Sequence, residues 1–181
     1  MPHALIRKAL ALIEMRREAE VATMIPTLER QKREGRSDPE LVSIIKDGLV
    51  LLQGNAAEQR AALDRLERQA ANPTPFAEYA PVYKWLVRHG RVAGALAAME
   101  QRTRIGHVPY DFLRLQKEFE PLATNDRFVR ILATTRAQFD DTVALLNESQ
   151  TRGELPAFLQ QPLQDLLRRL GLTGQRAQLA P

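Results

Sequence analysis

The chain has 181 residues, of which 44% are apolar and 27% are charged. This composition fits one folded domain with a hydrophobic core and excludes a disordered chain. Cysteine is absent, which excludes disulfide frameworks, thiolate zinc sites and thiol catalysis. The chain has 26 lysine and arginine residues and 22 aspartate and glutamate residues, which gives a net charge of +4. A charge of this size affects solubility and the electrostatic steering of binding partners, but it does not identify a partner.

No segment reaches ~18 uncharged apolar residues, so we expect none to span a membrane. The first 15 residues include Arg7, Lys8 and Glu14, which are too many charges for the apolar region of a signal peptide. We therefore expect a cytoplasmic protein. One helical-repeat domain is predicted over residues 1–172, followed by a flexible C-terminal tail over residues 173–181.

Helical periodicity runs along nearly the whole chain, and no segment alternates as a strand would. A first apolar stripe covers residues 5–13 and continues over residues 21–28, where Pro26 is expected to kink or restart the helix because it lacks a backbone donor. After Gly35, the run Ser37-Asp38-Pro39 predicts the cap and first turn of another helix.

The middle of the chain is divided by glycine and proline. Gly54 ends one predicted helix, and Asn55 is expected to cap the next with Glu58 as its reciprocal partner. Residues 72–75 form a break, after which a helix rich in aromatic residues is expected to begin or bend near Pro81.

Four more segments are predicted after Gly90. One helix runs from Val92 to about Ile105, and a short helix is expected near residues 116–122 of an otherwise irregular stretch. Asp126 caps a long helix that Gly153 ends, and the last helix covers residues 156–171. The sequence predicts an all-α protein of about 7–8 helices.

The breaks between helices recur at a constant spacing. Gly54 and Gly90 are 36 residues apart. Counting 36 residues back from Gly54 reaches Glu18, where the first helical pair should divide. Counting 36 residues forward from Gly90 reaches Asp126, where the long helix should begin. A period of this length with two helices per unit is typical of a short α-solenoid, in which stacked antiparallel helix pairs shelter one another's apolar faces.

Two segments resemble the tetratricopeptide-repeat family. In the run Gly90–Glu100, a glycine ends one helix and a small residue five positions later, Ala95, lets two helices approach, as in the second half of such a repeat. Residues 119–132 resemble the segment that closes tetratricopeptide regions in bacterial signalling and regulatory proteins, although Asn125-Asp126-Arg127 replaces the usual Asp-Pro-Arg. The resemblance covers about residues 49–132 and implies a superhelix that binds other proteins.

No residue pattern indicates an active site, so we expect no enzyme, no cofactor and no metal. His89 and His107 lie beside glycines at predicted helix ends, where the helix dipole favours histidine, and His3 lies near the terminus. Asp140 and Asp141 are neighbours on a helix and point about 100° apart, which does not make an acid–base pair.

The candidate partner-binding residues lie on and after one predicted helix: Lys84, Trp85, Arg88 and Arg91. Lys84 and Arg88 are four residues apart, so both charges project together, with Trp85 on the same side. In the family that the sequence resembles, such cations clamp the carboxylate of a peptide ligand. The alternative interpretation is that Trp85 packs between helices and that the cations are ordinary solvated charges.

Three functions remain open from the sequence. The first is a non-catalytic protein–protein interaction module, an adaptor whose partner is a protein or an acidic peptide. The second is a basic helical nucleic-acid-binding protein that uses residues 30–36 and 84–104 as phosphate contacts, with binding that weakens steeply with salt. The third is the subunit of a structural homo-oligomer, since a short solenoid exposes the faces of its end repeats.

Overall fold

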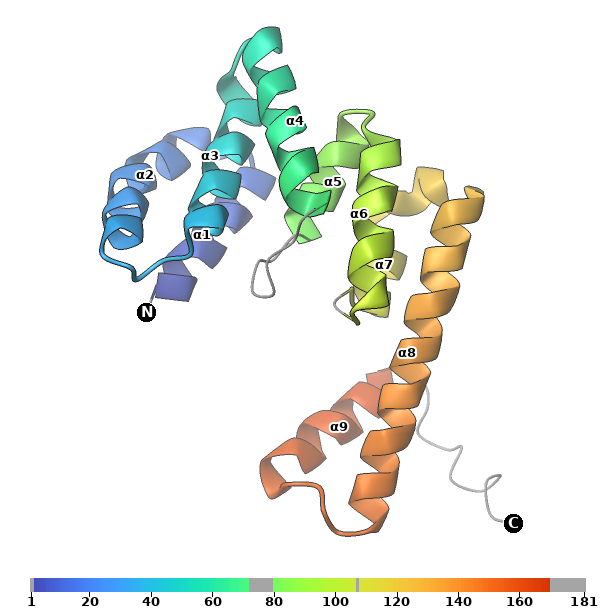
Figure 1. Cartoon of the computed structure of the whole chain (residues 1–181). Coiled ribbons are helices and arrows are strands. Elements are labelled where there is room, and N and C mark those ends of the chain that lie inside the picture. Colours follow the sequence, from blue (N-terminus) through green and yellow to red (C-terminus); the bar gives the residue numbers. More distant parts are fainter. Residues whose placement is uncertain (1, 72–79, 107, 170–181) are drawn as a thin grey trace. The chain divides into compact units, whose positions relative to one another are not determined.

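The computed structural model describes residues 2–71, 80–106 and 108–169, and every regular element within these ranges is a helix (Figure 1). The helices are α1 (Pro2–Glu14), α2 (Glu18–Arg33), α3 (Pro39–Gln53), α4 (Ala56–Ala71), α5 (Ala80–Arg88), α6 (Val92–Arg104), α7 (Tyr110–Leu115), the 3-10 helix η1 (Lys117–Leu122), α8 (Asp126–Thr151) and α9 (Ala157–Arg169). The all-α prediction is confirmed. The described ranges hold more helices than the expected 7–8, because α7 and η1 occupy the stretch interpreted as mostly irregular.

Local capping chemistry sets several of these boundaries as predicted. Asp38 caps α3 with Pro39 in its first turn. The Asn55 side chain accepts hydrogen bonds from the backbone N–H groups of Ala57 and Glu58, each at 3.0 Å. The Glu58 carboxylate accepts one in return from the backbone N–H of Asn55 at 2.8 Å, which confirms the reciprocal cap at the start of α4.

The repeat spacing also locates helix boundaries correctly. α2 begins at Glu18 and α8 begins at Asp126, as the 36-residue step predicts. Of the two outcomes expected at Pro26, a restart does not occur, because α2 continues through it, and a kink stays a prediction. Proline deprives the carbonyl four residues earlier of its partner, and that residue, Ala22, is exposed, so water can satisfy the carbonyl.

The chain forms two compact units, residues 1–135 and residues 136–181, and their boundary falls inside α8. The single domain predicted over residues 1–172 stays a prediction. The predicted break at residues 72–75, the end of the last helix at Gly171 and the tail over residues 173–181 lie outside the described residues.

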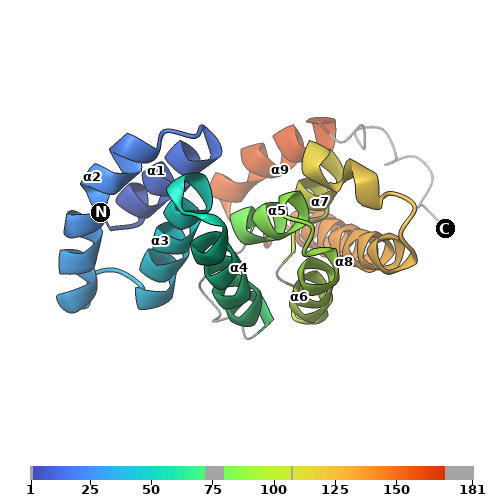
Figure 2. The ribbon, with the colours of Figure 1, turned by 90° about the horizontal axis from the view of Figure 1, so that it is seen from above.

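In unit 1, each helical pair packs on the next. α1 contacts α2 and α3, and α3 contacts α2 and α4; α4 contacts α5 and α6, which also contact each other (Figure 2). One continuous apolar core runs through these helices. It reaches η1 and the start of α8 through Phe119, whose ring lies 5.6 Å from that of Phe112 and 5.9 Å from that of Phe128.

The closest approach near the candidate site occurs at Gly48 of α3. A β-carbon at this position would lie 2.6 Å from Cη2 of Trp85 and 2.9 Å from Cδ1 of Ile13. Trp85 belongs to α5 and Ile13 to α1, and both side chains are buried. The absence of a side chain at Gly48 therefore lets residues of three helices meet at one point.

Unit 2 contains the later part of α8 and, among its described residues, α9. Val143, Leu155 and Leu163 are buried, whereas Leu145 and Phe158 are 66% and 75% exposed. None of the described helices combines the length and apolar character needed to cross a membrane.

Gly48→Ala is expected to lower the free energy of unfolding by about 1–2 kcal/mol. Alanine improves helix propensity by ~0.5–1 kcal/mol, but its methyl group would overpack the Trp85 ring at a cost of about 1–3 kcal/mol. Urea denaturation measures the difference.

Gly94→Ala is the matched control, since Gly94 also lies inside a helix. Its added methyl group would meet the flexible end of the Glu67 side chain, which can move aside. We expect this variant to be unchanged or more stable by up to about 1 kcal/mol. Equal destabilisation by the two substitutions would contradict the close approach at Gly48.

Candidate functional site

Three of the four predicted partner-binding residues converge on a carboxylate that the chain itself supplies. Lys84 Nζ lies 2.7 Å from Glu14 Oε2, and Arg88 Nη2 lies 2.9 Å from the same oxygen. Trp85 Nε1 donates to Glu14 Oε1 at 2.6 Å. We call these four residues the Glu14 cluster. The resemblance implied that these cations bind the carboxylate of a peptide ligand. In the structure they bind the side-chain carboxylate of Glu14, the last residue of α1.

Three members of the cluster are shielded from water, whereas the Arg88 side chain is 39% exposed. The Trp85 residue is 3% exposed, and the side chains of Lys84 and Glu14 are 13% and 22% exposed. Buried indole N–H groups need an acceptor, and Glu14 provides it. Arg88 also pairs with Glu118, so the cluster connects α1, α5 and η1.

The surroundings of Glu14 favour its charged form. Burial raises the pKa of this carboxyl, but the hydrogen bonds from Lys84 and Trp85 and the charges of Lys84 and Arg88 outweigh burial and hold the pKa below its ordinary value of 4.5. Glu14 therefore stays ionised at neutral pH and neutralises two cations that the sequence left unpaired.

Arg91, the fourth predicted residue, lies apart from the cluster. Its guanidinium pairs with Asp64 at 2.7 Å and with Glu67 at 3.5 Å, and both carboxylates belong to α4. Arg91 thus connects α4 to the start of α6. The use of Lys84, Trp85, Arg88 and Arg91 in partner binding stays a prediction.

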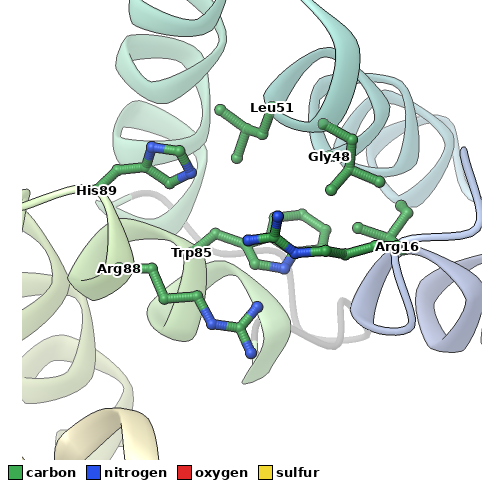
Figure 3. A pocket seen from close by; sticks show the side chains of 8 residues that line it. Arg16, Gly48, Leu51, Trp85, Arg88 and His89 are labelled. Atoms are coloured by element: carbon green, nitrogen blue, oxygen red, sulfur yellow. The ribbon is translucent and has the colours of Figure 1, made fainter.

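A hollow of about 370 Å³ lies next to the Glu14 cluster (Figure 3). Its apolar wall comes from α1, α3 and α5: Ile13, Leu51, Leu52 and Trp85, with Gly48 between them. Its polar side consists of basic residues: Arg16, Arg88 and His89. A volume of this size is sufficient for a small molecule or one side chain of a partner.

His89 directly follows the last residue of α5 and also lines this hollow. Burial lowers the pKa of its imidazole, and the neighbouring charges of Arg88 and Arg16 lower it further. The ring is therefore neutral at pH 7. His107 and the side chain of His3 lie outside the described part of the structure.

Arg16 has an uncommon backbone conformation. Its φ is +55°, and in the described ranges the other residues with positive φ are glycines: Gly35, Gly90, Gly106 and Gly153. A side chain in this left-handed region costs about 1–2 kcal/mol. The Arg16 side chain is exposed at the hollow and forms no hydrogen bond or ion pair with a described residue.

Sequence reasoning missed Glu14 and Arg16. Glu14 carried a signal, because a glutamate in the last turn of a helix opposes the helix dipole and no basic residue accompanies it there. Such a placement calls for a cation from elsewhere in the fold. Arg16 carried no signal, since arginine does not mark a left-handed position.

Within the described ranges, no three histidine, aspartate or glutamate side chains gather as metal ligands would. Asp140 forms an ion pair with Arg136 at 2.8 Å, one turn away on α8. The hollow itself offers apolar contacts and positive charge.

Glu14→Gln is expected to lower the free energy of unfolding at pH 7 by about 1–3 kcal/mol, because it leaves Lys84 and part of Arg88 without a counter-charge in a shielded place. The lowered pKa of Glu14 means that its contribution is present above pH 4.5 and is lost as pH falls through the lowered value. The difference between wild type and variant should thus shrink as the pH falls below 4.5.

Urea denaturation of both proteins at several pH values measures this effect. Glu20→Gln is the control, since Glu20 pairs with Arg17 on an exposed surface, and it should change stability by less than about 0.5 kcal/mol. A Glu14→Gln effect that does not depend on pH would contradict the account of the cluster.

Comparisons with known proteins give no further guide to this site. No family model matches the sequence, and neither a curated protein nor a solved structure matches the chain. The likeness to tetratricopeptide repeats thus depends on the residues quoted above. Function has to be argued from the geometry of the Glu14 cluster and the hollow.

Proposed function

We propose that the chain is a non-catalytic protein–protein interaction module, a tetratricopeptide-like adaptor in which the helical pairs of unit 1 stack as a short solenoid. The resemblance at residues 90–100 and 119–132 supports a regulatory role in bacterial signalling. The partner is a protein or peptide with acidic character, because the polar side of the hollow is basic.

The observation that carries this proposal is the composition of the hollow. The first helices of three successive pairs, α1, α3 and α5, supply its wall. An apolar recess beside fixed charges suits one anchor side chain of a partner, and a few such anchors supply most of the affinity of an interface.

In this proposal the predicted residues act in two ways. Trp85 and Arg88 line the hollow and contact the partner. Lys84 forms an ion pair with Glu14, and Arg91 forms one with Asp64 of α4. Both residues therefore act by stabilising the arrangement of the helices around the hollow. The partner contacts are therefore on the α1–α3–α5 side of unit 1.

The nucleic-acid alternative is less well supported. It needs exposed cations over residues 84–104, but Lys84, Arg88 and Arg91 pair with carboxylates of the chain. The remaining cluster, Arg30, Lys32 and Arg33, lies in the last turn of α2, where cations stabilise the helix dipole.

The homo-oligomer alternative has one observation in its favour, the exposure of Leu145 and Phe158 in unit 2. Self-association through this surface would bury apolar area that the described part of unit 2 leaves in water. Size-exclusion chromatography with light scattering tests this alternative by measuring the molar mass in solution. A monomeric wild type would contradict the alternative. A wild-type dimer that the substitution Phe158→Ser dissociates would support it.

A selection from a phage-displayed random peptide library tests the main proposal. We expect wild type to enrich a family of related peptides that combine apolar and acidic residues. Leu52→Glu, which places a charge in the wall of the hollow, should weaken their binding at least tenfold.

The control is Leu115→Glu, the same substitution at a residue that is 63% exposed and outside the hollow. It should leave peptide binding unchanged, and circular dichroism confirms that both variants fold. Enrichment of no peptide family, or peptide binding that Leu52→Glu leaves intact, would refute the proposal.

A further inference from the structure

Arg16 occupies the left-handed position that ends α1, where its own backbone N–H bonds to the carbonyl of Ile13 at 3.0 Å, while its side chain has no hydrogen-bond or ion-pair partner among the described residues. α1 ends at Glu14, and the backbone N–H of Arg17 bonds to the carbonyl of Leu12 at 2.9 Å, which closes the helix with Arg16 in the left-handed position. Glycine serves this geometry without strain. A strained residue at the edge of a recess points to a role in binding.

The Arg16 side chain extends over the hollow towards Trp85, and His89 extends into it from the opposite side (Figure 3). The two are close enough for the positive charge of Arg16 to depress the pKa of His89. The third basic residue of the lining, Arg88, is already shared by Glu14 and Glu118. Among the described residues of the lining, Arg16 is thus the cation whose charge is available to a ligand.

Among the described residues, the side chains that line the hollow include cations and no anion. None of these residues has a carboxylate, amide or hydroxyl side chain, the neutral His89 ring has one acceptor nitrogen, and the Trp85 N–H is already bonded to Glu14. A peptide backbone would bring N–H groups that need acceptors. A small acid brings an apolar group and acceptor oxygens, which matches what the lining offers.

We infer that the hollow binds a small carboxylic acid with a branched apolar group, its carboxylate on Arg16 and its apolar part against Ile13, Leu52 and Trp85. This inference rests on the proposed use of the hollow as a binding site. It adds that a free acid competes with the protein partner for that site. Binding places a negative charge beside His89, so it raises the pKa of the imidazole. The ligand thereby occupies the place of the partner's anchor side chain.

Fluorescence titration tests this directly, because Trp85 is the only tryptophan of the 181 residues and lies in the wall. The probe is 4-methylpentanoate, compared with 4-methylpentanamide, which lacks the charge, and with acetate, which lacks the apolar group. We expect saturable binding of 4-methylpentanoate and at least tenfold weaker binding of the other two. NMR titration of His89 should show a higher pKa in the presence of the acid.

The variant Arg16→Gly distinguishes an effect of Arg16 on ligand affinity from its effect on the stability of the fold. It removes the cation and relieves the left-handed strain, so the affinity for 4-methylpentanoate should fall at least tenfold while Tm rises by about 2–4 °C. Lys8→Ala is the control for net charge, since Lys8 is an exposed cation of α1 outside the hollow. It should change neither affinity nor Tm.

Several results would overturn the inference: equal binding of acid and amide, unchanged affinity in Arg16→Gly, a lower Tm in that variant, or no response of Trp85 and His89. A short peptide that ends in leucine is added as a separate arm. Binding of this peptide alone would refute the small-acid inference and leave the proposed peptide-binding function standing. Binding of the acid with no peptide family in the library selection would refute the proposed function and keep the hollow as a small-molecule site.

Discussion

The carboxylate of Glu14 is the interaction on which unit 1 and its candidate site depend. It ends α1 and receives hydrogen bonds from Lys84, Trp85 and Arg88, which lie about 70 residues later on α5. Helix pairs that only pack on their neighbours leave the first and third pairs without a specific link. Glu14 supplies that link through an ion pair that is partly shielded from water, and removing one partner would leave the other charge without compensation.

Gly48 makes this link possible and shapes the hollow beside it. Because α3 has no side chain at this position, the Trp85 ring and the Ile13 side chain approach each other over it. The indole N–H can then reach Glu14 while the ring forms part of the wall. One buried residue thus connects the packing of three helices to the surface that we propose as the binding site.

Local chemistry made much of the fold predictable, and long-range pairing limited the rest. Asn55, Glu18 and Asp126 could be located because caps and periodic breaks depend on nearby residues. The sequence left open whether the helix would kink or restart at Pro26, because that depends on whether the orphaned carbonyl of Ala22 is exposed to water in the fold. Lys84, Trp85 and Arg88 were rightly grouped on one face, but their partner Glu14 lies about 70 residues away, beyond the reach of a local pattern.

An NMR measurement of nuclear Overhauser effects between the Trp85 indole and the Ile13 δ1 methyl group tests this account most directly. The chain has a single tryptophan, so the indole signals are unambiguous. Both groups lie within 3 Å of the same point above Gly48. We expect strong cross-peaks between them and an indole N–H that exchanges slowly with water. Absent cross-peaks together with a rapidly exchanging indole N–H would show that α1 and α5 do not meet over α3.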